Sequence, residues 1–188
     1  MRDLLTRMQR GQPAVEAWIS DLHASSAPQS VAASATGFTR LGKYFPSSIL
    51  EQARAVTVDL IPFPPLGALG LPEFEALAAM PMAGITFGHM YFLHREHTHE
   101  AIHFHELVHV VQWTTLGVAA FLPTYALGIA RHGYESSPFE LAAFDLQAKF
   151  ERSDALPDMV DFIGRHAERT RQEAENVFRF VGLTMAAR

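Results

Sequence analysis

The sequence contains no cysteine, which excludes disulfide bonds and zinc sites built from thiolates. Any metal ion must therefore be held by histidine, aspartate or glutamate. A block of like charge is also lacking, and the net charge of −5 gives no basic surface of the kind that binds nucleic acid. The first seven residues, MRDLLTR, lack the apolar core of a secretory signal. We therefore expect a cytoplasmic protein without a nucleic-acid partner, with non-classical export left open.

Residues 110–130 form a run of 21 uncharged residues, which is the length needed to cross a bilayer. The run contains Gln112, Gly117 and Pro123, however, and it starts within a histidine motif described below. We therefore expect two buried helices with a break at Pro123, and no membrane span. The length of 188 residues, with 48% hydrophobic and 19% charged residues, predicts a globular chain with a sizeable core.

His105-Glu106-Leu107-Val108-His109 is an HExxH pattern, which is a zinc-site signature with a chemical reason behind it. On a helix, residues four apart lie about 40° apart around the axis, so both histidines project from one face. Two neutral imidazoles at this spacing can bind one Zn²⁺, and Glu106 lies within reach of a metal-bound water. Such a site activates water at neutral pH beside a carboxylate that takes the proton, which is the chemistry of peptide-bond hydrolysis. The alternative is a solvated amphipathic helix with two unrelated histidines.

Upstream of the motif, residues 1–24 are predicted to form one or two helical pieces, with Pro13 in the first turn of the second. Residues 24–37 are small and polar, which indicates a loop or linker. We therefore divide the chain into a helical arm and linker over residues 1–36 and a main domain over residues 37–188.

Short elements are expected between the linker and the motif. Ser47 is a suitable cap for a helix over residues 47–54, and residues 55–60 alternate like a half-buried strand before a turn-rich loop. Residues 84–93 (GITFGHMYFL) predict one bent strand or a hairpin, with a bulge at Gly88.

The motif helix is expected to start at Thr98 as its N-cap. An apolar stripe distinct from the histidine face would pack on the sheet, and the histidines would face a cleft. Further helices are predicted over residues 119–132, 138–152 and 155–183.

A catalytic zinc ion commonly has three protein ligands, so the motif needs a third. The acidic candidates downstream are Glu135 and Glu140 in the stretch YESSPFELAAFD. Ser137 to Glu140 is also a capping box, in which Glu140 would bond the backbone at the start of a helix.

HELVHVVQW followed by the PFE helix start resembles the gluzincin metallopeptidases, in which a glutamate from a later helix joins HExxH. Within that group it is most similar to minigluzincins and to metallopeptidase domains found beside bacterial toxin and contractile-injection systems. The resemblance covers residues 40–150. It implies an α+β, zincin-like fold: a small twisted sheet whose edge strand packs on the HExxH helix, followed by C-terminal helices. GITFGHMYFL would supply the edge strand that pairs with extended substrate.

Carried over by position, the resemblance implies His105, His109 and Glu140 as ligands of Zn²⁺, with Glu106 as general base. Tyr134 is the preferred candidate for stabilising the tetrahedral oxyanion, and Tyr125 and His132 are alternatives.

The residues near these ligands differ from the gluzincin pattern at one position. Gluzincins often carry an acidic residue four positions after the glutamate ligand, where this chain has Phe144. Asp145 is one position further on and could orient a ligand histidine. Gln112 would line the cleft or bond a neighbouring backbone group.

Four more histidines precede the motif: His94, His97, His99 and His103. We expect them at the surface or in loops, with a second, adventitious metal site as the alternative.

The expected function is that of a zinc metallopeptidase acting on a peptide or protein substrate. The alternative is a catalytically weak or inactive zincin-like metal-binding module that binds a partner or serves a toxin or secretion assembly. Hydrolysis of a non-peptide amide would use the same ligands. A cover over the site by residues 1–36 would favour a zymogen or a structural role. The oligomeric state is left open.

Overall fold

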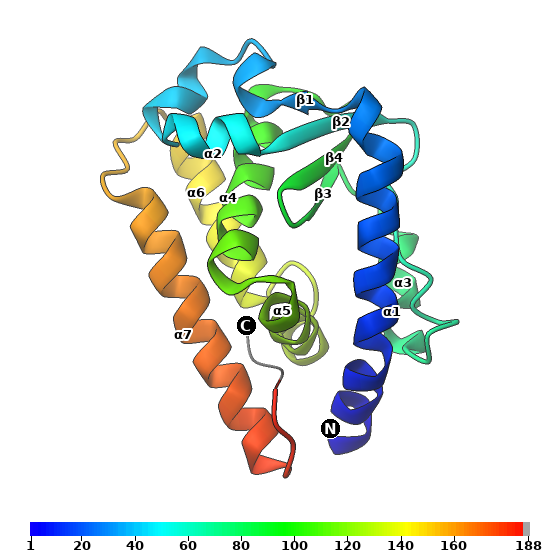
Figure 1. The fold of residues 1–188 in the computed structure, drawn as a ribbon. Coiled ribbons are helices and arrows are strands. Elements are labelled where there is room, and N and C mark those ends of the chain that lie inside the picture. Colours follow the sequence, from blue (N-terminus) through cyan, green and yellow to red (C-terminus); the bar gives the residue numbers. More distant parts are fainter. Residues whose placement is uncertain (186–188) are drawn as a thin grey trace.

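The computed structural model describes residues 1–185, and over this range the fold is mixed α+β (Figure 1). Helices and one small sheet enclose the HExxH helix, which confirms the expected class. The elements in chain order are α1 (Arg2–Ser26), β1 (Val31–Ala32), α2 (Ser47–Gln52), β2 (Arg54–Val58), α3 (Glu75–Ala78), β3 (Gly84–Phe87), β4 (Met90–His94), α4 (Glu100–Leu116), α5 (Val118–His132), α6 (Pro138–Glu151) and α7 (Met159–Phe180).

The four strands form one sheet in the order β1-β2-β4-β3, so β3 lies at an edge. The central pair, β2 and β4, is parallel, and β1 and β3 are antiparallel to their neighbours. β1 lies within residues 24–37, where a loop or linker is expected, and it shows that this segment also contributes to the sheet. The stretch over residues 84–93 is a hairpin. Gly88 lies in its turn with φ of +63°, so the predicted bulge was wrong and glycine is needed for the turn itself.

The HExxH helix, α4, lies at the centre of the fold, with β3, α6 and α7 packed around it (Figure 1). It is buried on almost every side: Phe104, Leu107 and Val108 are fully buried, and both motif histidines are only 6% exposed. The apolar residues of α4 pack on α6 and α7 as well as on the sheet, and His109 faces an enclosed cavity, which agrees with the expected cleft. The helix starts one residue later than expected, because His99 and not Thr98 occupies the N-cap position.

The uncharged run over residues 110–130 is interrupted at Gly117, which has φ of +71° and separates α4 from α5. The predicted break at Pro123 was wrong, because α5 continues through this residue. Proline removes the hydrogen bond to the carbonyl four residues earlier, which is that of Ala119. The side-chain amide of Gln12, from α1, donates to this carbonyl at 3.0 Å. A partner from another helix thus compensates for the bond that Pro123 lacks.

The N-terminal segment forms one continuous helix, α1, which continues through Pro13. Pro13 lies on the exposed face of α1, and the carbonyl that loses its partner there is that of the half-buried Gln9. The opposite face of α1 places Leu5, Met8, Val15 and Ile19 in the main hydrophobic core. Among the described residues, no helix has the length and hydropathy required to cross a bilayer.

Candidate metal centre

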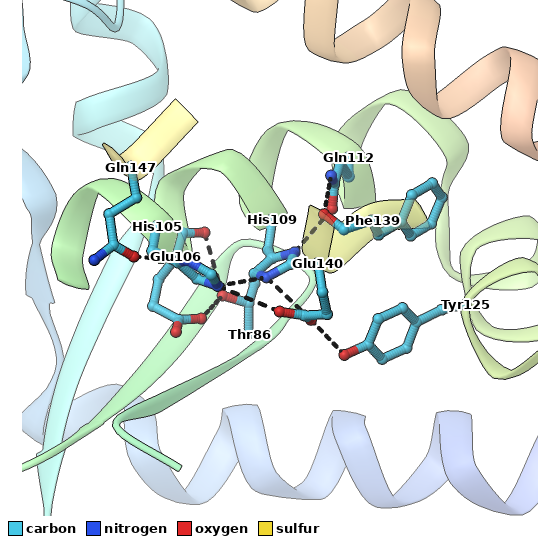
Figure 2. A network of polar contacts seen from close by, with 9 residues as sticks. All are labelled: Thr86, His105, Glu106, His109, Gln112, Tyr125, Phe139, Glu140 and Gln147. Carbon is cyan, nitrogen blue, oxygen red and sulfur yellow. Dashed lines mark hydrogen bonds and ion pairs between the residues drawn. The ribbon is translucent and has the colours of Figure 1, made fainter. Parts of the chain in front are cut away.

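Three side chains meet at the centre of the molecule: His105 and His109 from α4 and Glu140 from the first turn of α6 (Figure 2). The Nε2 atoms of the two histidines are 3.1 Å apart. Glu140 Oε2 lies 3.4 Å from Nε2 of His105, and Glu140 Oε1 lies 3.3 Å from Nε2 of His109. The structure therefore brings together the three residues that the resemblance implied as ligands.

The spacing of these atoms suits a tetrahedral metal ion. Around zinc with ligand bonds of about 2.0–2.1 Å, neighbouring ligand atoms lie about 3.3–3.4 Å apart. The three distances given above are close to this value, and the donor set of two imidazoles and one carboxylate is a common one for zinc.

The polar environment of Glu140 also indicates a cation. This carboxylate is 1% exposed, and its Oε2 atom accepts no hydrogen bond from the described residues. Burial would raise the pKa of Glu140, but the neighbouring His109 and His105 outweigh that effect and lower it. Burial would likewise lower the pKa of His109, but Glu140 outweighs it and raises this pKa to about 9. A buried carboxylate with an orphaned oxygen, beside two imidazole nitrogens, fits a bound cation.

Glu106 lies next to the three ligands and is 3% exposed. The hydroxyl of Thr86, on β3, donates to Oε2 of Glu106 at 2.7 Å. The Oε1 atom lies beside Gly84, where an added Cβ would be only 2.6 Å away. Burial raises the pKa of the Glu106 carboxyl against the opposing effect of His105 and His109. The edge strand thus fixes the orientation of this carboxylate, and a raised pKa suits a group that must accept a proton.

Two tyrosines lie on the other side of the ligands. The hydroxyl of Tyr125, on α5, donates to Glu140 Oε1 at 2.6 Å. Tyr134 is half-buried and lines the same cavity, and burial followed by Glu140 raises the pKa of both phenols. Both side chains therefore stay protonated and able to donate. His132 and Glu135 are exposed, and neither belongs to the cluster of candidate ligands.

A cavity of about 140 Å³ adjoins the site on the side of Glu106 and Tyr134. Its walls are mainly apolar side chains from α1, α5, β3 and the segment that joins β2 to β3. The helix α1, blue in Figure 2, passes across this side of the site. Residues from the N-terminal segment, such as Met8 and Val15, therefore form part of the wall beside the candidate metal centre.

Comparison of the chain with protein-family models, with curated proteins and with solved structures found no match. What the site can do therefore follows from its own residues.

Several contacts of the site residues were not anticipated from the sequence. Gln147 contacts His105, Gln112 contacts His109, and Thr86 donates to Glu106. Gln147 lies seven residues after Glu140, on the same face of α6, so helical periodicity could have indicated it. Asp145, the residue considered for this role, instead points to solvent and pairs with Lys149 at 2.6 Å.

Phe144 occupies the position where gluzincins often carry an acid. Its ring packs against that of His105, with centroids 4.8 Å apart. Phe144 therefore restricts the orientation of the His105 ring by van der Waals contact and not by charge.

The histidines before the motif divide into two groups. His103 is buried, contrary to expectation: the Tyr91 hydroxyl contacts its Nδ1 at 2.8 Å, and burial followed by His99 lowers its pKa to about 4. His97 and His99 are exposed, as expected. His94 and His97, with Glu96, form a second, mostly exposed group whose ligand atoms lie near one another.

Proposed function

We propose that the protein is a zinc-dependent metallopeptidase with a zincin-like, gluzincin-type site, in which His105, His109 and Glu140 hold the ion. The observation that carries this proposal is the meeting of these three buried side chains at ligand spacing, beside the Glu106 carboxylate. When bound, zinc would supply a Lewis acid that activates water and polarises the carbonyl of the substrate. The residues of the chain account for the remaining steps.

Glu106 would accept the proton of the attacking water and later pass it to the leaving amine. Its burial and the bond from Thr86 support this role, since they raise its affinity for a proton and restrict its orientation. Tyr134, which is protonated and lines the cavity, is the candidate donor to the oxyanion. Tyr125 is less suited to it, because its hydroxyl already donates to Glu140.

The edge strand offers backbone groups to a substrate. The amide of His94 donates to the carbonyl of Ala83, so these two residues form a hydrogen-bonded pair. In an antiparallel pair of strands, every second residue counted from Ala83 along β3 then bonds to β4. By this alternation, the N–H and C=O groups of Gly84 and Thr86 point away from β4, towards the edge of the sheet that no strand pairs with. Both residues also border Glu106. An extended peptide that pairs here would pass close to the general base.

The cavity supports an apolar group next to the scissile bond. Its lining includes Phe63, Leu71, Trp113 and Phe121, and its charged groups, Glu106, Glu140 and His109, all belong to the site. We therefore infer that a preferred peptide carries an uncharged, apolar side chain at the position that enters this cavity.

A second function is favoured by the enclosure of the site. All three ligands are at most 6% exposed, and α1 forms one wall of the adjoining cavity while contributing to the main core. These features support the alternative of a zincin-like metal-binding module with weak or no catalysis. Hydrolysis of a small non-peptide amide would suit the enclosed cavity as well.

The test combines metal analysis with the substitution Glu106→Gln, which removes the base and none of the ligands. The proposal requires one zinc ion per chain in the wild type and in this variant, and cleavage of a peptide library by the wild type alone. Glu51→Gln, on the exposed end of α2, is the matched control and should keep both properties. Purified protein that binds no zinc refutes the proposal. Stoichiometric zinc without peptide cleavage supports the module, and cleavage of other amides supports the third possibility.

A further inference from the structure

Each candidate ligand histidine contacts the side-chain amide of a glutamine through its other ring nitrogen (Figure 2). Nδ1 of His105 lies 3.0 Å from Oε1 of Gln147, on α6. Nδ1 of His109 lies 2.8 Å from Oε1 of Gln112, one turn further along α4. The two contacts are alike although they come from different helices.

A second bond fixes which end of each amide faces the imidazole. The Nε2 group of Gln112 donates to the carbonyl of Phe139 at 3.3 Å, and that of Gln147 donates to Oε1 of Glu151 at 2.9 Å. Carbonyl and carboxylate oxygens only accept, so the amide nitrogens must face them and the amide oxygens must face the rings. Each Nδ1 therefore carries a hydrogen that it donates to the glutamine.

We propose that Gln112 and Gln147 are positioning residues that keep a hydrogen on Nδ1 of both ligand histidines, so that Nε2 is the nitrogen left for the metal ion. This proposal rests on the proposed function, since it concerns the same metal site. With Nδ1 donating to a glutamine, each ring directs its Nε2 atom towards the other ring and Glu140. The two glutamines thus orient both rings so that Nε2 is the nitrogen that faces the position of the cation before it binds.

Both positioning groups are uncharged. Zinc-bound histidines commonly donate to a carboxylate, a backbone carbonyl or water. Here the nearby acid on α6, Asp145, pairs with Lys149 at the surface instead. The carboxylates of Glu106 and Glu140 alone then balance the two charges of a divalent ion. The glutamines give the orientation that a carboxylate would give, without a third negative charge in a buried site.

Gln147 is the better position for a test, because it is partly exposed whereas Gln112 is fully buried. Gln147→Met removes the acceptor at similar length, and we expect zinc affinity, measured by competition with a chelator, to fall about 10–100-fold. Gln147→Glu restores an acceptor and should bring the affinity back to the wild-type value or above it. Gln112→Met should lower the affinity as well.

A spectroscopic measurement separates positioning from a general structural effect. In metal-free protein, the ring ¹⁵N shifts of His105 should show the Nδ1–H tautomer alone. In Gln147→Met they should show a mixture with the Nε2–H tautomer. Asp145→Asn on the same helix and Gln172→Met on the exposed face of α7 are matched controls, and both should behave as the wild type.

The outcomes keep this proposal and the proposed function apart. Wild-type protein without zinc refutes the proposed function. Wild-type protein that binds zinc, together with a Gln147→Met variant of equal affinity and an unchanged His105 tautomer, overturns the positioning role while the metal site stands. The positioning role is also overturned if zinc affinity falls in Gln147→Met and Gln147→Glu does not restore it.

Discussion

Zinc should stabilise the folded chain through Glu140 and not through Glu135. The ligands come from two helices, α4 and α6, so the complete site exists only in the folded state. An ion that binds only the folded state stabilises it by about 2.7 kcal/mol when its free concentration is 100 times the dissociation constant. For a chain of this size, that corresponds to a rise in melting temperature of about 5–11 °C.

The substitution Glu140→Gln removes the charged ligand that lies 3.3 Å and 3.4 Å from the two imidazoles. If zinc affinity falls about 100-fold, the same zinc concentration stabilises the fold by only about 0.4 kcal/mol. The melting temperature should then rise by about 1–2 °C. Glu135→Gln is the same chemical change five positions earlier, at an exposed residue outside the cluster, and it should keep the full shift.

The assay is thermal unfolding of metal-free protein at increasing zinc concentration, followed by intrinsic fluorescence for the wild type and both variants. A full shift in Glu140→Gln, or the loss of the shift in Glu135→Gln, would refute the assignment of the third ligand. An equal small shift in all three proteins would show that zinc binds the surface only.

Three further predictions follow from contacts near the site. Gly84→Ala places a Cβ 2.6 Å from Oε1 of Glu106, so the carboxylate must move by several tenths of an ångström. Peptide cleavage by this variant should fall up to about 100-fold, and its zinc content should stay unchanged. Zinc binding at pH 7 should release about one proton from His109, because the pKa of His109 in the metal-free fold is about 9. The affinity for zinc should therefore rise from pH 7 to 9 and then level off. Titration calorimetry in several buffers would measure both the affinity and the number of protons released. Gln12→Leu leaves the Ala119 carbonyl without its donor and should lower the unfolding free energy by about 1 kcal/mol, which thermal unfolding would show as a loss of about 2–4 °C.

The glycine prediction has a matched control in Gly42→Ala, since a Cβ at Gly42 meets no atom within 4 Å. That variant should cleave peptide as the wild type does. Equal activity of both alanine variants would contradict the role of Gly84 in making room for the general base.

Local sequence patterns predicted several elements well. The HExxH helix, the helix after Ser137 and the strands within residues 84–94 were predicted from residue periodicity and composition, which act over a few residues, although the cap at Thr98 and the bulge at Gly88 were wrong. Continuation of α5 through Pro123 was not predictable in this way. It depends on Gln12, more than a hundred residues earlier, which bonds the carbonyl that proline leaves without a partner.

The contacts that orient the site residues were also beyond local patterns. Thr86 reaches Glu106 only because β3 lies at the sheet edge against α4. Gln147 was overlooked in favour of Asp145, because an acid is the usual partner of a zinc-bound histidine. The burial of most of α4, including both motif histidines, depends on the packing of α6, α7 and β3 around it.

The sequence by itself determined the chemistry available to this protein. Without cysteine, a metal site had to use histidine and carboxylate, and the spacing of His105 and His109 put two imidazoles on one helical face. Only the tertiary structure decided between Glu135 and Glu140 as the third residue of the cluster, and which groups hold the others in place. The physical reason is that helix periodicity fixes directions within one element, whereas distances between elements depend on how the whole core packs.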